Sequence, residues 1–196
     1  MFMQRFLFTV SPQCVIRAIC AVCALCFSAL GASTASAETI TLRPYRAVWP
    51  SGWDVSHLPS PITHSGKNLG GERMRVLLTA EGVVLAAIEL TYFPRRDNGR
   101  ANLAEEFDQI RSGTRAAYER QKFKANLTPA QALTIGGQSA LTTELSFASD
   151  SLHLMQWIGV ALSPQFLYSL TFTASEENYA RYRPQFDAVK QSITLQ

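Results

Sequence analysis

The cysteines of this chain are confined to its N-terminal end, at Cys14, Cys20, Cys23 and Cys26. Every residue after Cys26 must therefore fold without a disulfide and without a cysteine metal ligand. The free energy that holds such a domain together has to come from burial of apolar side chains and from hydrogen bonds. A chain of about 160 residues buries enough surface to fold in this way as one domain.

Residues 1–37 have the pattern of a cleaved secretory signal peptide. Arginines precede an apolar run from Ile19 to Leu30, and Ala35 and Ala37 form an A-x-A cleavage site. We therefore expect cleavage after Ala37 and a protein that works outside the cytoplasm, either in a periplasm or as a secreted protein. The cysteine spacing is similar to a redox or metal motif, but a cysteine-rich leader explains it. A membrane anchor would need about 20 apolar residues, more than this run or any later segment supplies.

The remaining chain, residues 38–196, is predicted to be a single domain with little net charge. Arg5 and Arg17 are the charged residues of the leader, so its removal lowers the formal charge from +3 to +1. A nearly neutral domain has no strong electrostatic attraction to nucleic acid or to anionic lipid. We therefore expect another protein or a component of the cell envelope as the partner, and the oligomeric state stays open.

Alternating apolar residues predict that most of this domain is β-strand. The runs 73–80 and 83–93 are joined at Glu81-Gly82 and predict a hairpin. Further strands are predicted at 39–49, 130–135, 139–148, 152–162 and 166–174. Residues 54–72 contain several prolines and glycines and are predicted to form a long loop, a feature that is often functional.

Two helices complete the predicted fold. The first spans residues 102–124 and has Asn102 as its N-cap, and the second begins near Ser175, which is also a suitable N-cap. Pro184 predicts a kink or a restart in the second helix. The order of elements predicts an α+β fold, in which an antiparallel sheet of about six strands is covered by a long central helix and a C-terminal helix.

The predicted loop carries the candidate metal ligands of the chain. Asp54, His57 and His64 lie close together in sequence, and a metal-dependent hydrolase built on them is one alternative. Zinc sites usually need three or four convergent ligands at recognisable spacings, and no such spacing is present. These residues are therefore weak candidates, and we expect neither a metal nor a cofactor.

Other catalytic patterns are missing or incomplete. Serine never occurs as G-x-S-x-G, and no glycine-rich phosphate loop is present. Glu89 and Glu144 lie on predicted strands, where we expect them on outward faces. A pair of carboxylates of the glycosidase kind stays open as an alternative, because such pairs meet in space rather than in sequence. No catalytic residue is assigned, and a non-enzymatic role is favoured.

Aromatic and apolar side chains suggest two further surfaces. His153, Met155 and Trp157 share one face of a predicted strand, which is a candidate partner-binding patch if exposed and a layer of core if a helix covers it. Trp49 and Trp53 flank a turn. They would line the groove of a small-ligand carrier, or else pack the end of the domain.

Several segments, taken in order, resemble the PsbP-like fold. They are Pro50-Ser51-Gly52-Trp53, the long helix after the first hairpin, Gly136-Gly137-Gln138-Ser139-Ala140, 168–177, 182–186 and Gln191-Ser192-Ile193. The pattern is similar to that of exported bacterial proteins of unknown function that are related to the DcrB-type periplasmic group. The resemblance implies an α/β/α sandwich and a periplasmic accessory or binding protein that contacts another protein or an envelope component. It brings no catalytic residues with it.

Overall fold

The computed structural model describes residues 38–42, 44–55, 60–64, 67–95 and 101–196. The predicted leader, residues 1–37, lies outside the described residues. In chain order the elements are β1 (Glu38–Leu42), β2 (Tyr45–Trp49), β3 (Ser60–His64), β4 (Lys67–Ala80), β5 (Val83–Pro94), α2 (Leu103–Glu119), β6 (Lys124–Leu127), β7 (Gln131–Ile135), β8 (Gln138–Ala148), β9 (His153–Leu162), β10 (Phe166–Ser175), α3 (Glu176–Ser192) and β11 (Thr194–Leu195).

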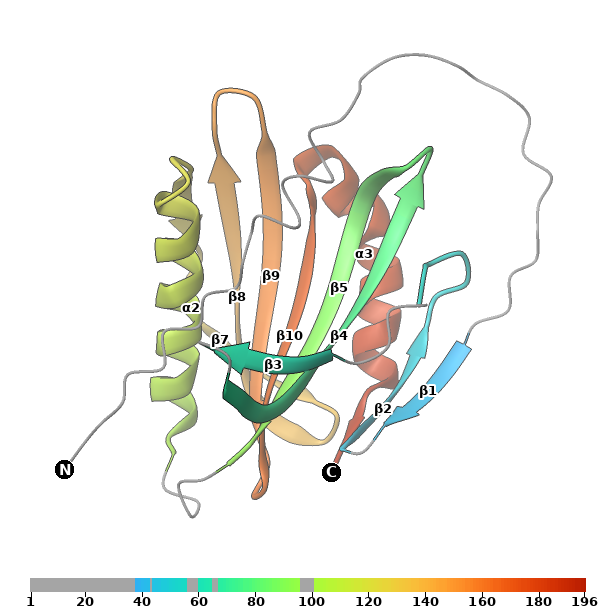
Figure 1. Ribbon diagram of the computed structural model, residues 1–196. Coiled ribbons are helices and arrows are strands. Elements are labelled where there is room, and N and C mark those ends of the chain that lie inside the picture. The colour runs from blue at the N-terminus through green and yellow to red at the C-terminus, as the bar shows by residue number, and fades with distance from the viewer. Residues whose placement is uncertain (1–37, 43, 56–59, 65–66, 96–100) are drawn as a thin grey trace.

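An eight-stranded sheet forms the centre of the molecule (Figure 1). Its order is β3-β4-β5-β10-β9-β8-β6, with β7 also paired to β8, and every pairing in it is antiparallel. A second sheet of three strands has the order β1-β2-β11. The predicted α+β class is confirmed. The sheet has more strands than the expected six because β3 lies in a segment that was predicted as loop, and β6 lies between the predicted first helix and the next predicted strand.

Each face of the main sheet carries its own helix and its own apolar core (Figure 1). We call them the α2 face and the α3 face. On the α2 face, Phe107, Ile110 and Tyr118 of the helix belong to one core with Leu145 and Ile158 of the sheet. On the α3 face, the core is larger because β2 joins it, and its fully buried side chains include Trp49, Ile88, Phe172 and Phe186. Burial on both faces explains why β9 is apolar along nearly its whole length.

Side-chain caps start both helices where the sequence predicted. The Asn102 side chain accepts a hydrogen bond from the backbone N–H of Ala104 at 2.9 Å, and the Ser175 hydroxyl accepts one from Asn178 at 3.3 Å. Such caps satisfy amide groups that have no partner inside a helix. None of the described helices is long and apolar enough to cross a membrane.

The structure corrects the predicted end of the first helix. This helix stops at Glu119 rather than at Lys124, because Lys122 adopts a left-handed φ of 67° and turns the chain into β6. The second helix continues through Pro184, so it does not restart there, which was one of the two predicted outcomes. Pro184 and Ala180, whose carbonyl loses its helical partner, are both exposed, so water can replace the missing hydrogen bond.

Two segments predicted as single units are divided differently. The predicted strand 39–49 is two antiparallel strands, β1 and β2. Much of the predicted loop 54–72 is β-structure, because β4 begins at Lys67 and pairs with β3. A Cβ atom on Gly71 would lie 2.2 Å from the backbone oxygen of Tyr92. Glycine is therefore used here for close approach between strands, not for a loop.

Candidate functional site

The two strand glutamates lie on opposite faces of the sheet. Glu89 is in register with Thr171, Ile158 and then Thr143 across neighbouring strands, which places it on the α2 face. Glu144 follows Thr143 in β8 and therefore points to the α3 face. A sheet separates the two carboxylates, so Glu89 and Glu144 cannot form a catalytic pair with each other. Each is instead the centre of a separate charged cluster.

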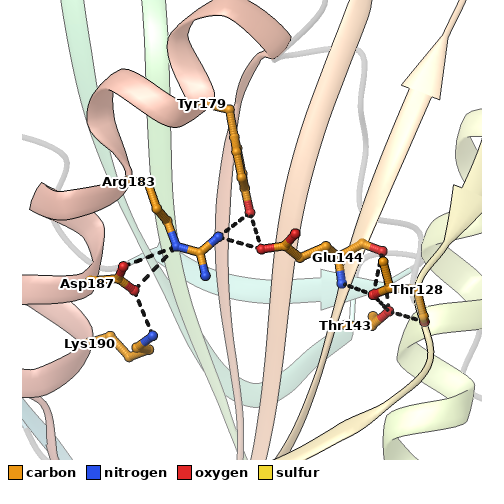
Figure 2. Close-up of polar contacts among 7 residues, drawn as sticks. All are labelled: Thr128, Thr143, Glu144, Tyr179, Arg183, Asp187 and Lys190. Atoms are coloured by element: carbon orange, nitrogen blue, oxygen red, sulfur yellow. Dashed lines mark hydrogen bonds and ion pairs between the residues drawn. The ribbon is translucent and has the colours of Figure 1, made fainter.

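The first cluster joins β8 to α3, and Figure 2 shows its geometry. Glu144 Oε1 accepts a hydrogen bond from the guanidinium of Arg183 at 2.5 Å and another from the Tyr179 hydroxyl at 3.1 Å. Arg183 also donates to the Tyr179 oxygen at 2.6 Å. Tyr179 and Arg183 are one helical turn apart, so both reach the same carboxylate. The three groups form a closed ring of hydrogen bonds.

Two threonines fix the strand from which Glu144 projects. The backbone N–H of Glu144 donates to the Thr128 hydroxyl at 2.9 Å, and the Thr143 hydroxyl donates to the Thr128 carbonyl at 2.8 Å (Figure 2). Thr143 is 2 % exposed, so its own bond to Thr128 is partly shielded from water, whereas the Thr128 hydroxyl that accepts from Glu144 is exposed. Thr128 follows β6, and it therefore ties this edge of the sheet to the cluster.

The cluster continues along α3 toward Trp157. Arg183 Nε lies 3.3 Å from Asp187, and Lys190 Nζ lies 2.7 Å from the same carboxylate. The Lys190 ammonium is also 5.3 Å from the centre of the Trp157 ring, within the range of a cation–π contact. The two cations and two carboxylates of this cluster balance each other. We call Glu144, Arg183, Asp187 and Lys190, together with neighbouring Met155, the α3–β8 surface.

Tyr179 and Arg183 keep their protonation states near neutral pH. Burial is the main cause that raises the pKa of Tyr179; the Arg183 charge lowers it and the Glu144 charge raises it again. Burial disfavours the charge of Arg183, but the hydrogen bond that it donates to Glu144 and the charges around it leave its pKa raised. The tyrosine stays a neutral donor and the arginine stays a cation. The arrangement offers fixed charges for recognition rather than a group that exchanges protons.

The second cluster lies on the α2 face, on β4 and β5. Arg75 donates to Glu89 Oε2 from Nε at 3.0 Å and from Nη2 at 2.7 Å. Arg73 Nε lies 3.2 Å from Glu89 Oε1, although this contact is not aligned as a hydrogen bond. The side chains of Arg73 and Arg75 are 28 % and 23 % exposed, and that of Glu89 is 12 % exposed. One carboxylate is therefore shared by two guanidinium groups.

The charges of this second cluster affect the pKa of a buried tyrosine of α2. Burial is the main cause that raises the pKa of Tyr118, the Glu89 carboxylate raises it further, and the Arg75 charge lowers it. The Tyr118 ring stacks on Phe147 at a centroid distance of 3.7 Å. The electrostatic field of the cluster therefore reaches the flank of α2.

The candidate metal ligands are not brought together in the described part of the chain. Asp54 is exposed, and its backbone forms a bridge with Leu77 of β4. His64 ends β3, and His57 lies outside the described residues. No group of three or more metal-ligating side chains is found within the described ranges.

The α3 helix covers only part of the strand face that is the candidate partner-binding patch. Trp157 is 3 % exposed and contacts Phe186 of the helix at 5.0 Å between ring centres, so it belongs to the core. Its burial under the C-terminal helix agrees with the alternative that this part of the strand face is a layer of core. Met155 is half-buried, and His153 is an exposed residue at the strand end that contacts Glu176 at 3.3 Å.

The two tryptophans of the ligand-carrier alternative also pack the core. Trp49 is 0 % exposed and Trp53 is 5 % exposed. The Trp53 indole N–H donates to Gln185 at 2.6 Å, and its ring meets Tyr182 edge-on. These rings join the end of the domain to α3 and do not line an open groove.

Sequence reasoning missed most members of both clusters. Tyr179 packs in the apolar core on the α3 face, but its hydroxyl enters the polar network. The helical spacing of Arg183, Asp187 and Lys190 contains a local sign of a charged stripe. Arg73 and Arg75 alternate on a strand and must share a face. The sequence contains no sign of which glutamate each set would meet.

Comparisons with known proteins agree with this fold. The cyanobacterial PsbP protein (CyanoP) from Synechocystis sp. PCC 6803 has a TM-score of 0.58 and 16% sequence identity, over 87% of this chain and 98% of that one. This likeness shows a PsbP-like fold. LpqN, involved in cell envelope biogenesis of Mycobacterium tuberculosis, has a TM-score of 0.40 and 14% identity, over 83% of this chain and 92% of that one.

A protein of unknown function from Pseudomonas aeruginosa has a TM-score of 0.46 and 15% identity, over 67% of this chain and 86% of that one. No curated protein matches the chain. The model of a domain of unknown function, DUF4946, matches residues 45–195, from the second strand to the last. The chain therefore belongs to the DUF4946 family.

Proposed function

We propose that this protein is an exported, non-enzymatic binding protein that contacts another protein through its α3–β8 surface. The observation that carries the proposal is the charged network around Glu144 and Arg183, which is partly exposed and held on rigid elements. Its placement outside the cytoplasm rests on the leader pattern of residues 1–37. The similarity to the DcrB-type periplasmic group supports the same placement.

The chemistry of the surface favours a protein partner. Arg183, Lys190, Glu144 and Asp187 alternate in sign within one network, so the surface has no excess charge to attract nucleic acid or anionic lipid. Met155 adds a half-buried apolar side chain, in register with Ser146 on the neighbouring strand. A partner with its own mixed charges can exchange ion pairs with this surface and gain orientation from them.

The rigid support of the surface favours binding without large rearrangement. Glu144 is fixed through the hydrogen bonds of Thr128 to β8, and Arg183 is held between two carboxylates. Side chains held in place lose little conformational entropy when a partner binds. The network thus presents charges at set positions.

Site-specific photo-crosslinking tests the binding surface. A photoreactive residue at Ser146, beside Met155, is expected to trap one specific product in the cell envelope fraction of the native host. The matched control is Gln109, an exposed position on α2. Reversal of charge in Asp187→Lys should reduce the product from Ser146 several-fold while the folded state, followed by circular dichroism, is retained. Equal products from Ser146 and Gln109, or no effect of Asp187→Lys, would contradict the proposed surface.

Export is tested separately. Fractionation of the native host followed by N-terminal sequencing is expected to recover a periplasmic or secreted species that begins at Glu38. An intact Met1 on a cytosolic species would overturn the proposed placement, whatever the crosslinking shows.

A further inference from the structure

We propose that the Arg73–Arg75–Glu89 cluster on the α2 face binds the carboxylate of a small hydroxylated acid. This site is on the opposite side of the sheet from the α3–β8 surface. It therefore stands or fails independently of the protein-binding role.

The first argument is charge. Two guanidinium groups meet one carboxylate in this cluster, which leaves one positive charge without a counter-ion among the described residues. The side chains of the two arginines are only 23–28 % exposed, so water solvates this positive charge less well than it would at the surface. A bound monoanion would neutralise the cluster.

The second argument is the number of free donors. Arginine carries five N–H groups in a planar fork that matches a carboxylate in two parallel hydrogen bonds. Arg73 approaches Glu89 through Nε, and its two Nη groups have no hydrogen bond or ion pair to another of the described residues. In the proposed site this terminal fork binds the second carboxylate.

The third argument is a set of polar side chains beside the arginines, on the same face of the sheet. Thr171 pairs with Glu89 across β10 and β5, and Ser169 pairs with Thr91, so their side chains share the α2 face with the cluster. Both are half-buried, and neither hydroxyl has a hydrogen-bond partner among the described residues. These hydroxyls can donate to and accept from the hydroxyl groups of a ligand.

A buried side-chain amide extends this set of polar side chains along the same face of the sheet. Gln156 is 6 % exposed and donates to the Thr173 hydroxyl at 2.8 Å. Its Oε1 atom is buried and accepts no hydrogen bond from the described residues. A buried acceptor without a donor is costly, and a ligand hydroxyl or a water that accompanies the ligand would satisfy it.

Nuclear magnetic resonance of the arginine Nε–H groups tests the site directly. The folded protein, isotope-labelled, is titrated at constant ionic strength with sodium gluconate, sodium acetate or sodium phosphate, with sodium chloride as the reference. Gluconate is expected to shift the Arg73 and Arg75 signals in a saturable way, and to bind more tightly than acetate because of its hydroxyl groups. The signals of Arg183 and Arg115 serve as internal controls. Each of those arginines already has its own carboxylate partners.

Two variants with opposite expected effects make the test strict. Arg73→Gln should weaken gluconate binding by about tenfold or more, because a bidentate ion pair is lost. Glu89→Gln should strengthen it, because the internal competitor for both guanidinium groups is removed. Arg115→Gln, on the exposed side of α2, should leave it unchanged. If Arg73→Gln fails to fold, Arg73→Lys keeps the charge without the fork and should still weaken binding.

Three outcomes would overturn the proposal. The first is the absence of saturable shifts at Arg73 and Arg75 with gluconate. The second is an equal shift at Arg183, which would indicate non-specific ion binding. The third is tighter binding of phosphate than of gluconate, which would assign the site to a phosphate group rather than to a carboxylate.

Discussion

The two charged clusters of this protein are built around one strand glutamate each, but they use it in opposite ways. On the α3 face, Glu144 shares Arg183 with Asp187, and Lys190 closes the set, so every charge has a partner. On the α2 face, Arg73 and Arg75 share the single carboxylate of Glu89, so among the described residues one positive charge of this cluster has no counter-ion.

The difference follows from what each cluster connects. The balanced network spans two elements that are distant in sequence, β8 and α3, and therefore contributes to holding the helix on the sheet (Figure 2). The unbalanced cluster lies within one hairpin, where β4 and β5 are already joined by backbone hydrogen bonds. Its side chains are not needed for that pairing. A cluster that does not have to connect distant elements can leave donors for a ligand, although its partly buried charges still contribute to stability.

The largest expected effect comes from the apolar base of the balanced cluster. Phe186 is 0 % exposed, stacks on Phe172 at 4.9 Å, and lies under both Arg183 and Lys190. Phe186→Ala should lower the free energy of unfolding by about 3–5 kcal/mol, because it removes buried contacts and leaves a cavity. Urea denaturation followed by tryptophan fluorescence measures this.

The matched control for that variant is Ala180→Ser, an exposed position on the same helix, which should change stability by less than about 0.5 kcal/mol. A loss below about 1 kcal/mol for Phe186→Ala would mean that α3 is not held by this core.

The next prediction compares the stability lost when each of the two glutamates is replaced by glutamine. Glu89→Gln should cost about 2 kcal/mol, because two partly buried guanidinium groups lose their shared carboxylate. Glu144→Gln should cost only about 1 kcal/mol, because Arg183 keeps Asp187 and the carboxylate of Glu144 is more exposed. Parallel urea titrations of both variants give the order, and a larger loss for Glu144→Gln would reverse our interpretation of the clusters.

A smaller effect concerns the Tyr179 hydroxyl. Tyr179→Phe should cost about 0.5–1.5 kcal/mol near neutral pH, because its hydrogen bond to Glu144 is lost. The folded state raises the pKa of Tyr179, so this tyrosine stabilises the fold below its unfolded pKa of about 10 and loses that contribution as pH rises through the folded value.

The pH dependence provides its own check. Unfolding free energies at pH 8 and pH 11 are expected to fall less steeply for Tyr179→Phe than for the unaltered protein. An identical fall in both proteins would show that Tyr179 ionises as freely in the folded state as in the unfolded chain.

The smallest effect is expected at the exposed pair of His153 and Glu176. Their side chains are 62 % and 67 % exposed, so solvent screens the interaction. His153→Ala should change the free energy of unfolding by no more than about 0.5 kcal/mol. Thermal unfolding with and without added salt measures this. A larger, salt-sensitive loss would show that exposed pairs also help to hold α3 on β9.

Much of the fold was predictable because its causes are local. Apolar alternation predicted β5, β8, β9 and β10 to within about two residues, and the caps at Asn102 and Ser175 predicted both helix starts. The predictions failed where a residue type has two uses. Gly71 was interpreted as part of a loop, but it permits close contact between two strands.

The candidate site was much less predictable than the fold. Trp157 and Met155 are two residues apart and share one face of β9. Trp157 is nevertheless buried under α3, whereas Met155 is only half-buried. Covering depends on where the helix lies across the sheet. That position is set by packing between distant segments and leaves no local periodicity.

The amino-acid sequence by itself determined the class of fold, the starts of both helices and the absence of cysteine after residue 26, because propensity, capping and composition act over a few neighbouring residues. Only the tertiary structure decided that Glu144 meets Arg183 while Glu89 meets two arginines on the other face. Strand order and register bring together charges that are far apart in the chain, and a shift of one residue in register would exchange the two faces.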